Sequence, residues 1–227
     1  MWLLKINSYL NYLLNIIFPA FCPICKIKIS PQDQDICKDC LARLEKTGLP
    51  VCISRKNKQF FFEKTLSVFA YSGIARKCLH LIKYRRKTRL AKALAELMAS
   101  FLDKHINTND LDVIVAVPLH RAKFSTRGFN QAQILANTIG RRFNIPCSCG
   151  SLLRIKKTGS QFDLSRKERL ANVGNAFKCT KDHLFKNKKI LLVDDIFTTG
   201  ATLNECSRIL KIAGAEKITT FTFARQR

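Results

Sequence analysis

The sequence is poor in acidic residues and in the residues that interrupt regular structure. Its 227 residues include 16 Asp and Glu against 40 Lys and Arg, with only 9 Gly and 6 Pro. So little Gly and Pro excludes a collagen-like or low-complexity chain, and 47% hydrophobic residues exclude disorder as the dominant state. No heptad pattern persists, which excludes a long coiled coil. A folded domain with a small appendage remains.

The shortage of acids leaves a formal net charge of +24. Such a surplus attracts phosphate groups, either in a nucleic acid or in a polyphosphate ligand. Residues 64–95 concentrate it, because this stretch contains Lys and Arg but no acid. Two interpretations stay open: contact with a polyanion, or a lysine-rich surface that is simply solvated.

The chain also lacks a clean membrane-spanning run. Residues 2–18 are rich in Leu and Ile, but polar residues at positions 5, 7, 8, 11 and 15 interrupt them, and a spanning helix needs about 20 mostly apolar residues. No signal-peptide pattern is present either. We therefore expect an amphipathic helix that packs on its own protein and ends at Pro19, with peripheral membrane association as the alternative. The sequence therefore predicts no transmembrane segment. It also predicts a cytoplasmic location, because six of the ten Cys are scattered as in proteins of the reducing cytosol.

The other four Cys have the spacing of a metal site. Cys22 and Cys25 form one C-x-x-C knuckle, and Cys37 and Cys40 form a second. Two knuckles supply four thiolates, which is the ligand set of a structural Zn²⁺. Four protein ligands leave no open position, so the metal is expected to stabilise the fold. A redox C-x-x-C is the competing interpretation, but it needs only one knuckle.

Apolar runs and periodicity predict alternating strands and helices in the rest of the chain. This order indicates an α/β domain with a mostly parallel sheet flanked by helices. A basic loop is expected over 118–130, and Ser165 to Glu168 form a capping box for a short helix. Strands are expected over 65–71, 112–117, 151–155, 189–193 and 217–224. Helices are expected over 74–104, with a basic break near 84–89, and over 131–142. A last helix is expected to begin at a capping box at 202–205 and to end at about 213.

The clearest candidate site follows the apolar run 190–193. Asp194 and Asp195 come directly after it, followed by a short hydroxyl-rich loop and then a helix. Backbone N–H groups at a helix N-terminus, together with Thr hydroxyls, surround a phosphate well. The two carboxylates repel that phosphate, so they must face hydroxyls, a metal or a developing cation. Neither the P-loop pattern nor the Rossmann glycine pattern occurs in the chain, which disfavours those two kinds of nucleotide site.

These residues resemble a known family. The run LLVDDIFTTGAT resembles the phosphoribosyl-pyrophosphate (PRPP) motif of type I phosphoribosyltransferases, and the chain as a whole resembles the ComF family of competence-related proteins. The resemblance implies a type I phosphoribosyltransferase-like fold over 64–227 and a small zinc-binding module over 1–63. Four segments carry it: the knuckles at 22–40, VPLHRAKFSTRGFNQAQILA at 117–136, LRIKKTGSQFDLSRKERLANVGNAF at 153–177, and the PRPP motif followed by AGAEKITTFTFAR at 213–225.

The resemblance also implies roles for individual residues. Asp194 and Asp195 match the acidic pair that holds the ribose hydroxyls. Mg²⁺ bridges diphosphate and ribose oxygens, as a hard cation prefers. The loop for the 5′-phosphate comprises Thr198, Thr199, Gly200, Ala201 and Thr202, and the pyrophosphate loop comprises Pro118, Leu119 and His120, continued by the basic residues Arg121, Lys123 and Arg127.

Two alternatives stay open at the level of single residues. His120 contacts the diphosphate or is an ordinary loop histidine. Four residues are candidates for a mobile lid: Gln161, Arg166, Arg169 and Asn172. For Arg169 and Asn172 the alternative is that they fix a helix to the domain. The family commonly has further cysteine pairs, but here only Cys52 follows the knuckles, so a second zinc site is not expected.

The implied function is Mg²⁺-dependent binding of PRPP by a phosphoribosyltransferase-like protein linked to competence and DNA uptake, with an acceptor that the sequence does not name. Competence-machinery proteins are the implied partners. The alternative is an accessory protein that binds single-stranded nucleic acid through its basic surface, in which the transferase fold is a ligand sensor or inactive. The charge of +24 favours this alternative, and the run from 190 to 202 favours the first interpretation.

Overall fold

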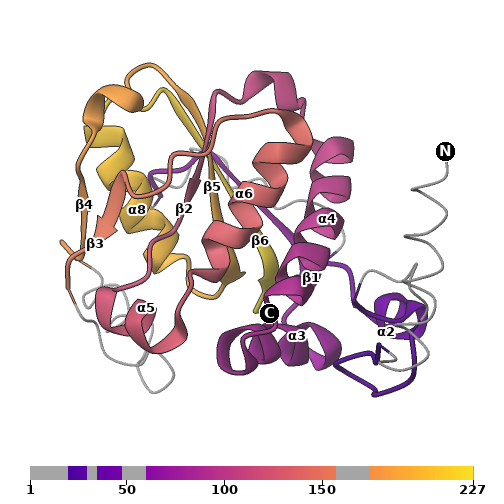
Figure 1. Ribbon diagram of the computed structural model, residues 1–227. Coiled ribbons are helices and arrows are strands. Elements are labelled where there is room, and N and C mark those ends of the chain that lie inside the picture. The colour runs from indigo at the N-terminus through magenta and orange to yellow at the C-terminus, as the bar shows by residue number, and fades with distance from the viewer. Residues whose placement is uncertain (1–19, 30–34, 48–59, 157–173, 227) are drawn as a thin grey trace, which may run out of the picture.

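The structure is a computed structural model, and it describes residues 20–29, 35–47, 60–156 and 174–226. Within these residues the main domain is a three-layer α/β arrangement, with helices on both faces of one sheet (Figure 1). The expected helix over 2–18, the capping box at 165–168, Cys52 and the four candidate lid residues lie outside the described residues.

The sheet contains four parallel strands in the order β1-β6-β5-β2. Their bounds are β1 Lys64–Ala70, β2 Val113–Ala116, β5 Lys189–Phe197 and β6 Lys217–Arg225. Both edges receive a short extra pairing. Lys46 of the N-terminal module bridges Phe69 on β1, and Cys147 bridges Ile114 on β2. The predicted parallel α/β fold is therefore confirmed.

Alternate residues of the central strand β5 face two separate cores. Leu191 and Val193 belong to the core that contains the helices α3 (Gly73–Arg85), α4 (Thr88–His105) and α6 (Gln131–Phe143). Ile190 and Leu192 belong to the core formed with α8 (Ala201–Ile212) and a two-stranded antiparallel sheet. The remaining elements are α2 (Lys38–Ala42), α5 (Arg121–Arg127), β3 (Leu152–Arg154), β4 (Phe177–Cys179), and the 3₁₀ turns η1 (Thr108–Asp110) and η2 (Asp182–Leu184).

The described part of the N-terminal module packs on the main domain. Cys22, Cys37 and Cys40 are buried in the same core as Cys78 and Leu79 of α3. The pairing of residue 46 with β1 adds a backbone connection. The two parts share this core, so their packing does not mark where one ends and the other begins. The domain boundary predicted at residue 63 stays a prediction.

The expected basic loop over 118–130 is wrong, because it contains α5. His120 caps this helix, since its Nδ1 accepts a hydrogen bond from the Ala122 N–H at 3.2 Å. Gly128, with φ +82°, ends it. Histidine is not among the usual capping residues, which is why the pattern was missed.

Two further expectations around the acid pair need correction. The strand does not end at Val193 but continues through Asp194 and Asp195 to Phe197, because β6 runs beside it as far as Arg225. The capping box at 202–205 is also wrong, since the N-cap of α8 is Gly200, two residues before Thr202. Glu205 instead accepts hydrogen bonds from Arg208 and from the Asn175 N–H.

Candidate functional site

The two aspartates occupy successive positions near the carboxyl end of β5. Asp195 is 3% exposed, whereas Asp194 is partly exposed. The Asp195 N–H donates to Asp194 Oδ1 at 2.8 Å. Because a buried carboxylate is costly unless it is paired, Asp195 needs a group that compensates its charge.

Lys83 of α3 is that group, and the sequence did not identify it. Its Nζ forms an ion pair with Asp195 Oδ2, and the side chains are 23% and 5% exposed. Burial opposes ionisation of both groups, but their mutual attraction prevails: it raises the pKa of Lys83 and lowers the pKa of Asp195. Burial and the neighbouring Asp195 charge raise the pKa of Asp194 well above its usual value. Asp195 is therefore firmly ionised, whereas Asp194 holds its proton more tightly than an ordinary aspartate does.

A three-residue loop joins β5 to α8. Gly200 has φ +78°, and a Cβ at this position would lie 2.8 Å from Phe197 Cζ. The Thr199 Oγ1 accepts from the Ala201 N–H at 3.4 Å. Glycine at the N-cap brings no side chain of its own, so the positive end of the α8 dipole lies beside the loop, where it favours an anion.

A cleft of about 1450 Å³ connects this loop, the acid pair and α5. Of the 13 site residues predicted from the sequence, ten line it: Pro118, Leu119, Lys123, Arg127, Asp194, Asp195, Thr198, Gly200, Ala201 and Thr202. The other three do not. Thr199 and His120 are engaged in the hydrogen bonds described above, and Arg121 lies at the exposed start of α5. These contacts support a structural role for His120 better than a contact with the diphosphate.

Positive charge converges on the cleft. Lys123 is the clearest example, because partial desolvation and the nearby charges of Arg154, Arg127 and Lys83 lower its pKa. Arg154 of β3 is a second residue that the sequence did not identify; its guanidinium lies 5.5 Å from the Phe177 ring centroid. Among the residues that the structure describes, the acids that line the cleft are Asp194 and Asp195 alone. The cations that line it are Lys26, Arg76, Lys77, Lys83, Arg85, Lys87, Lys123, Arg127 and Arg154.

The zinc module contributes a wall of the same cleft. Pro23, Ile24 and Lys26 line it. These residues belong to the first knuckle, where the Lys26 N–H donates to the Cys22 carbonyl at 2.9 Å and Lys26 has φ +66°. The knuckle turn thus places a cationic residue at the cleft.

The four predicted zinc ligands come together. The sulfur atoms of Cys22, Cys25, Cys37 and Cys40 all lie within 4.8 Å of one another. Tetrahedral Zn–S bonds of about 2.3 Å place sulfurs about 3.8 Å apart, so the cluster fits Zn²⁺. Burial opposes ionisation of Cys22, yet hydrogen bonds from backbone N–H groups of the two knuckles lower its pKa to about 6, which suits a thiolate ligand. No other group of three or more metal-ligating side chains was found in the part of the chain that the structure describes.

No helix among the described residues is long and apolar enough to cross a bilayer. The N-terminal residues 1–19 lie outside that search.

Models of known domain families match both parts of the chain. The model of the phosphoribosyl transferase domain matches residues 83–227, and the model of the double zinc ribbon domain matches residues 13–66. The second range contains five Cys, which is enough for one four-cysteine site only.

Individual relatives agree with these domain matches. Competence protein F of Haemophilus influenzae is 34% identical over 147 residues, which cover 63% of this chain and 64% of that protein. DNA utilization protein YhgH of Escherichia coli K12 is 27% identical over 223 residues, covering 91% and 97%. A solved glutamine PRPP amidotransferase from Bacillus subtilis is 20% identical and covers 57% of this chain and 25% of that one, with a TM-score of 0.39.

Proposed function

Because this chain belongs to the phosphoribosyl transferase domain family, as a homologue of the ComF-type competence proteins, we propose that it binds PRPP with Mg²⁺ in the cleft of about 1450 Å³. Asp194 and Asp195 receive the ribose hydroxyls. The loop 198–202 and the N-terminus of α8 receive the 5′-phosphate. Lys123 and Arg127 face the diphosphate. The site operates in the cytosol, where the free thiols of the chain persist.

The same arrangement suits transfer of the phosphoribosyl group. Breaking the bond between C1 and the diphosphate leaves positive charge on the ribose and negative charge on the leaving group. The carboxylates stabilise the first and the cations of α5 stabilise the second. Mg²⁺ held beside Asp194 and Asp195 would supply further neutralisation of the leaving group.

One observation supports the proposal most directly. The two carboxylates, the glycine N-cap of α8 and the basic helix α5 line one cleft, although they come from residues 118–127 and 194–202. A ligand with a sugar between two phosphate groups needs two anion sites and a hydroxyl site in one cleft.

Calorimetric titration with PRPP and Mg²⁺ tests the proposal. Wild type should bind, and the Asp194→Ala/Asp195→Ala double variant should bind at least about ten times more weakly, a change of about 1.4 kcal/mol or more. Asp112→Asn is the control, because this exposed carboxylate lies outside the cleft beside Lys188. Equal affinities for wild type and the double variant would contradict the proposal.

A second candidate function is binding of single-stranded nucleic acid, which the nine cations lining the cleft favour. Fluorescence anisotropy with a labelled oligothymidine at several salt concentrations tests it, since log K should fall with log salt by about 0.7 for each phosphate contacted. Arg76→Ala/Lys77→Ala, on α3, should reduce the affinity and the salt slope. Binding that does not depend on salt would contradict this function.

A further inference from the structure

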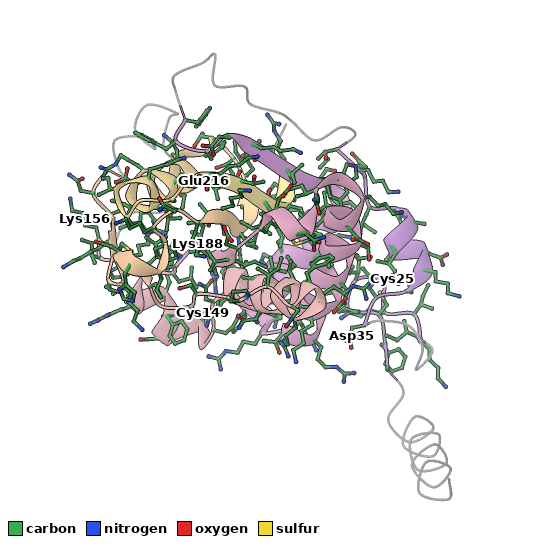
Figure 2. The ribbon with its side chains drawn as sticks, turned by 90° about the horizontal axis from the view of Figure 1, so that it is seen from above. Cys25, Asp35, Cys149, Lys156, Lys188 and Glu216 are labelled. Atoms are coloured by element: carbon green, nitrogen blue, oxygen red, sulfur yellow. The ribbon has the colours of Figure 1, made fainter. Side chains whose placement is uncertain are left out.

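Two cysteine thiols outside the zinc cluster lie next to each other. The Sγ atoms of Cys147 and Cys149 are 3.5 Å apart. Cys149 is well separated from Cys25 of the zinc cluster (Figure 2), and neither Cys147 nor Cys149 lines the large cleft. The proposed binding of PRPP and the structural zinc therefore leave this pair without a role.

The backbone explains why the two thiols meet. The Ile114 N–H donates to the Pro146 carbonyl and the Ser148 N–H donates to the Ile114 carbonyl, both at 2.9 Å, so residues 146–148 are held against the edge of β2. The Cys149 N–H then donates to the Cys147 carbonyl at 3.2 Å, which closes a three-residue turn. The separation of 3.5 Å between the two sulfurs shows that this turn brings both side chains together.

The two sulfurs differ in accessibility. Cys149 is exposed, and its Sγ donates to Asn137 Oδ1 of α6 at 3.3 Å, whereas Cys147 is half-buried. Burial and the neighbouring Cys149 sulfur raise the pKa of Cys147 to about 12. The exposed thiol is thus the one that meets a reagent first, with the half-buried thiol beside it in a position to resolve the product.

We propose that Cys147 and Cys149 are a redox modification site that closes to an intramolecular disulfide by exchange with a small-molecule disulfide such as oxidised glutathione. The Cys149 thiolate attacks one sulfur of the reagent, forms a mixed disulfide and releases one thiol. The Cys147 sulfur, after losing its proton to solvent, attacks the Cys149 sulfur and releases the second thiol. Two protein thiols are oxidised and one reagent disulfide is reduced, so atoms and electrons balance.

The geometry allows closure. A disulfide has an S–S distance of about 2.05 Å, so the sulfurs must approach by about 1.5 Å. Cys149 supplies this movement by rotation of its exposed side chain, which gives up the hydrogen bond to Asn137 Oδ1. Cys78 and Cys206 are both fully buried and offer no comparable site.

Digestion with trypsin places Cys147 and Cys149 together on one peptide, which can be measured by mass spectrometry. Cleavage after Arg142 and Arg154 releases the peptide 143–154, which contains Cys147 and Cys149 and no other Cys. The zinc-loaded full chain is incubated with glutathione buffers of increasing oxidised fraction, quenched with acid, alkylated and analysed by mass spectrometry. The peptide should shift from doubly alkylated to a form lacking two hydrogens, about 2 Da lighter than the free dithiol, and dithiothreitol should reverse the shift.

Single variants separate closure from simple thiol reactivity. Cys147→Ser should stop at a Cys149–glutathione mixed disulfide, and Cys149→Ser should react at least about ten times more slowly than wild type, because the half-buried thiol meets the reagent alone. Zinc content, measured in parallel, should stay constant. A wild-type peptide that remains a dithiol, or that carries one or two glutathiones without closing, would overturn the proposal.

Discussion

Gly200 is subject to two independent constraints. Its φ of +78° costs any other residue about 1–2 kcal/mol, and an added Cβ would lie 2.8 Å from the Phe197 ring. Gly200→Ala should therefore lower the unfolding free energy by more than that cost and weaken PRPP binding. Gly150→Ala is the matched control, because its φ is +82° and no atom lies within 4 Å of the added Cβ. Equal losses in urea unfolding for the two variants would show that the Phe197 contact does not matter.

The raised pKa of Asp194 predicts how stability depends on pH. The folded state binds this proton more tightly than the unfolded state, whose carboxyl titrates near pH 3.9. Stability is therefore lost as the pH rises from about 4 towards the folded pKa. Asp194→Asn cannot ionise, so its unfolding temperature relative to wild type should increase over this window and then level off. A difference that stays flat from pH 4 to pH 8 would contradict the raised pKa.

The residues of the candidate site differ in how far the sequence could predict them. Asp194, Asp195 and the loop to Thr202 form one continuous run, so local pattern was sufficient. Lys83 was not identifiable, because it is over a hundred residues from Asp195 in the chain and only the docking of α3 joins them. Arg154 was missed for the same reason, since it reaches the cleft from β3, on the small second sheet.

Among the elements, α3 connects the acid pair to the rest of the fold. Lys83→Met should leave the buried Asp195 carboxylate without its partner, and breaking a buried pair in this way typically costs about 3–5 kcal/mol. Adding Asp195→Asn should recover part of the loss by removing the unpaired charge. Urea unfolding of the single and double variants measures both effects.

Arg89→Met is the control for this prediction. Arg89 pairs with Asp35, but its side chain is 84% exposed, so its loss should change stability by no more than about 1 kcal/mol. If Lys83→Met were as mild as Arg89→Met, the Lys83–Asp195 pair would contribute nothing to stability.

Sequence patterns predicted buried elements well and exposed ones poorly. The strands β2 and β5 were identified because the continuous apolar runs 113–117 and 190–193 signal burial on both faces. The helix α5 has no buried residue, so it gave no hydrophobic period, and its histidine cap gave no start signal. The extension of β5 past Val193 was equally invisible, because it depends on pairing with β6 and not on the polarity of Asp194.

In the whole molecule, the zinc module and the main domain share one hydrophobic core and one cleft. Cys22 and Cys40 are buried with Leu79 of α3, and Lys26 lines the cleft together with Lys83. Loss of the metal should therefore affect more than the module, because four adjacent sulfurs, three of them on buried cysteines, cannot all remain thiolates without Zn²⁺. The effect should reach the cleft through α3, which touches both.

Removal of zinc with a strong chelator should lower the unfolding temperature of the full chain by at least about 6 °C, or about 2–3 kcal/mol for a chain of this size, in a single transition. PRPP affinity should fall in the same preparation, since the cleft loses the wall formed by Pro23, Ile24 and Lys26. Cys37→Ser should reproduce both effects, whereas Cys149→Ser should reproduce neither, because its thiol lies outside the cluster. A zinc-free protein that unfolds in two steps, with the main transition and the PRPP affinity unchanged, would show instead that the module is energetically independent of the site.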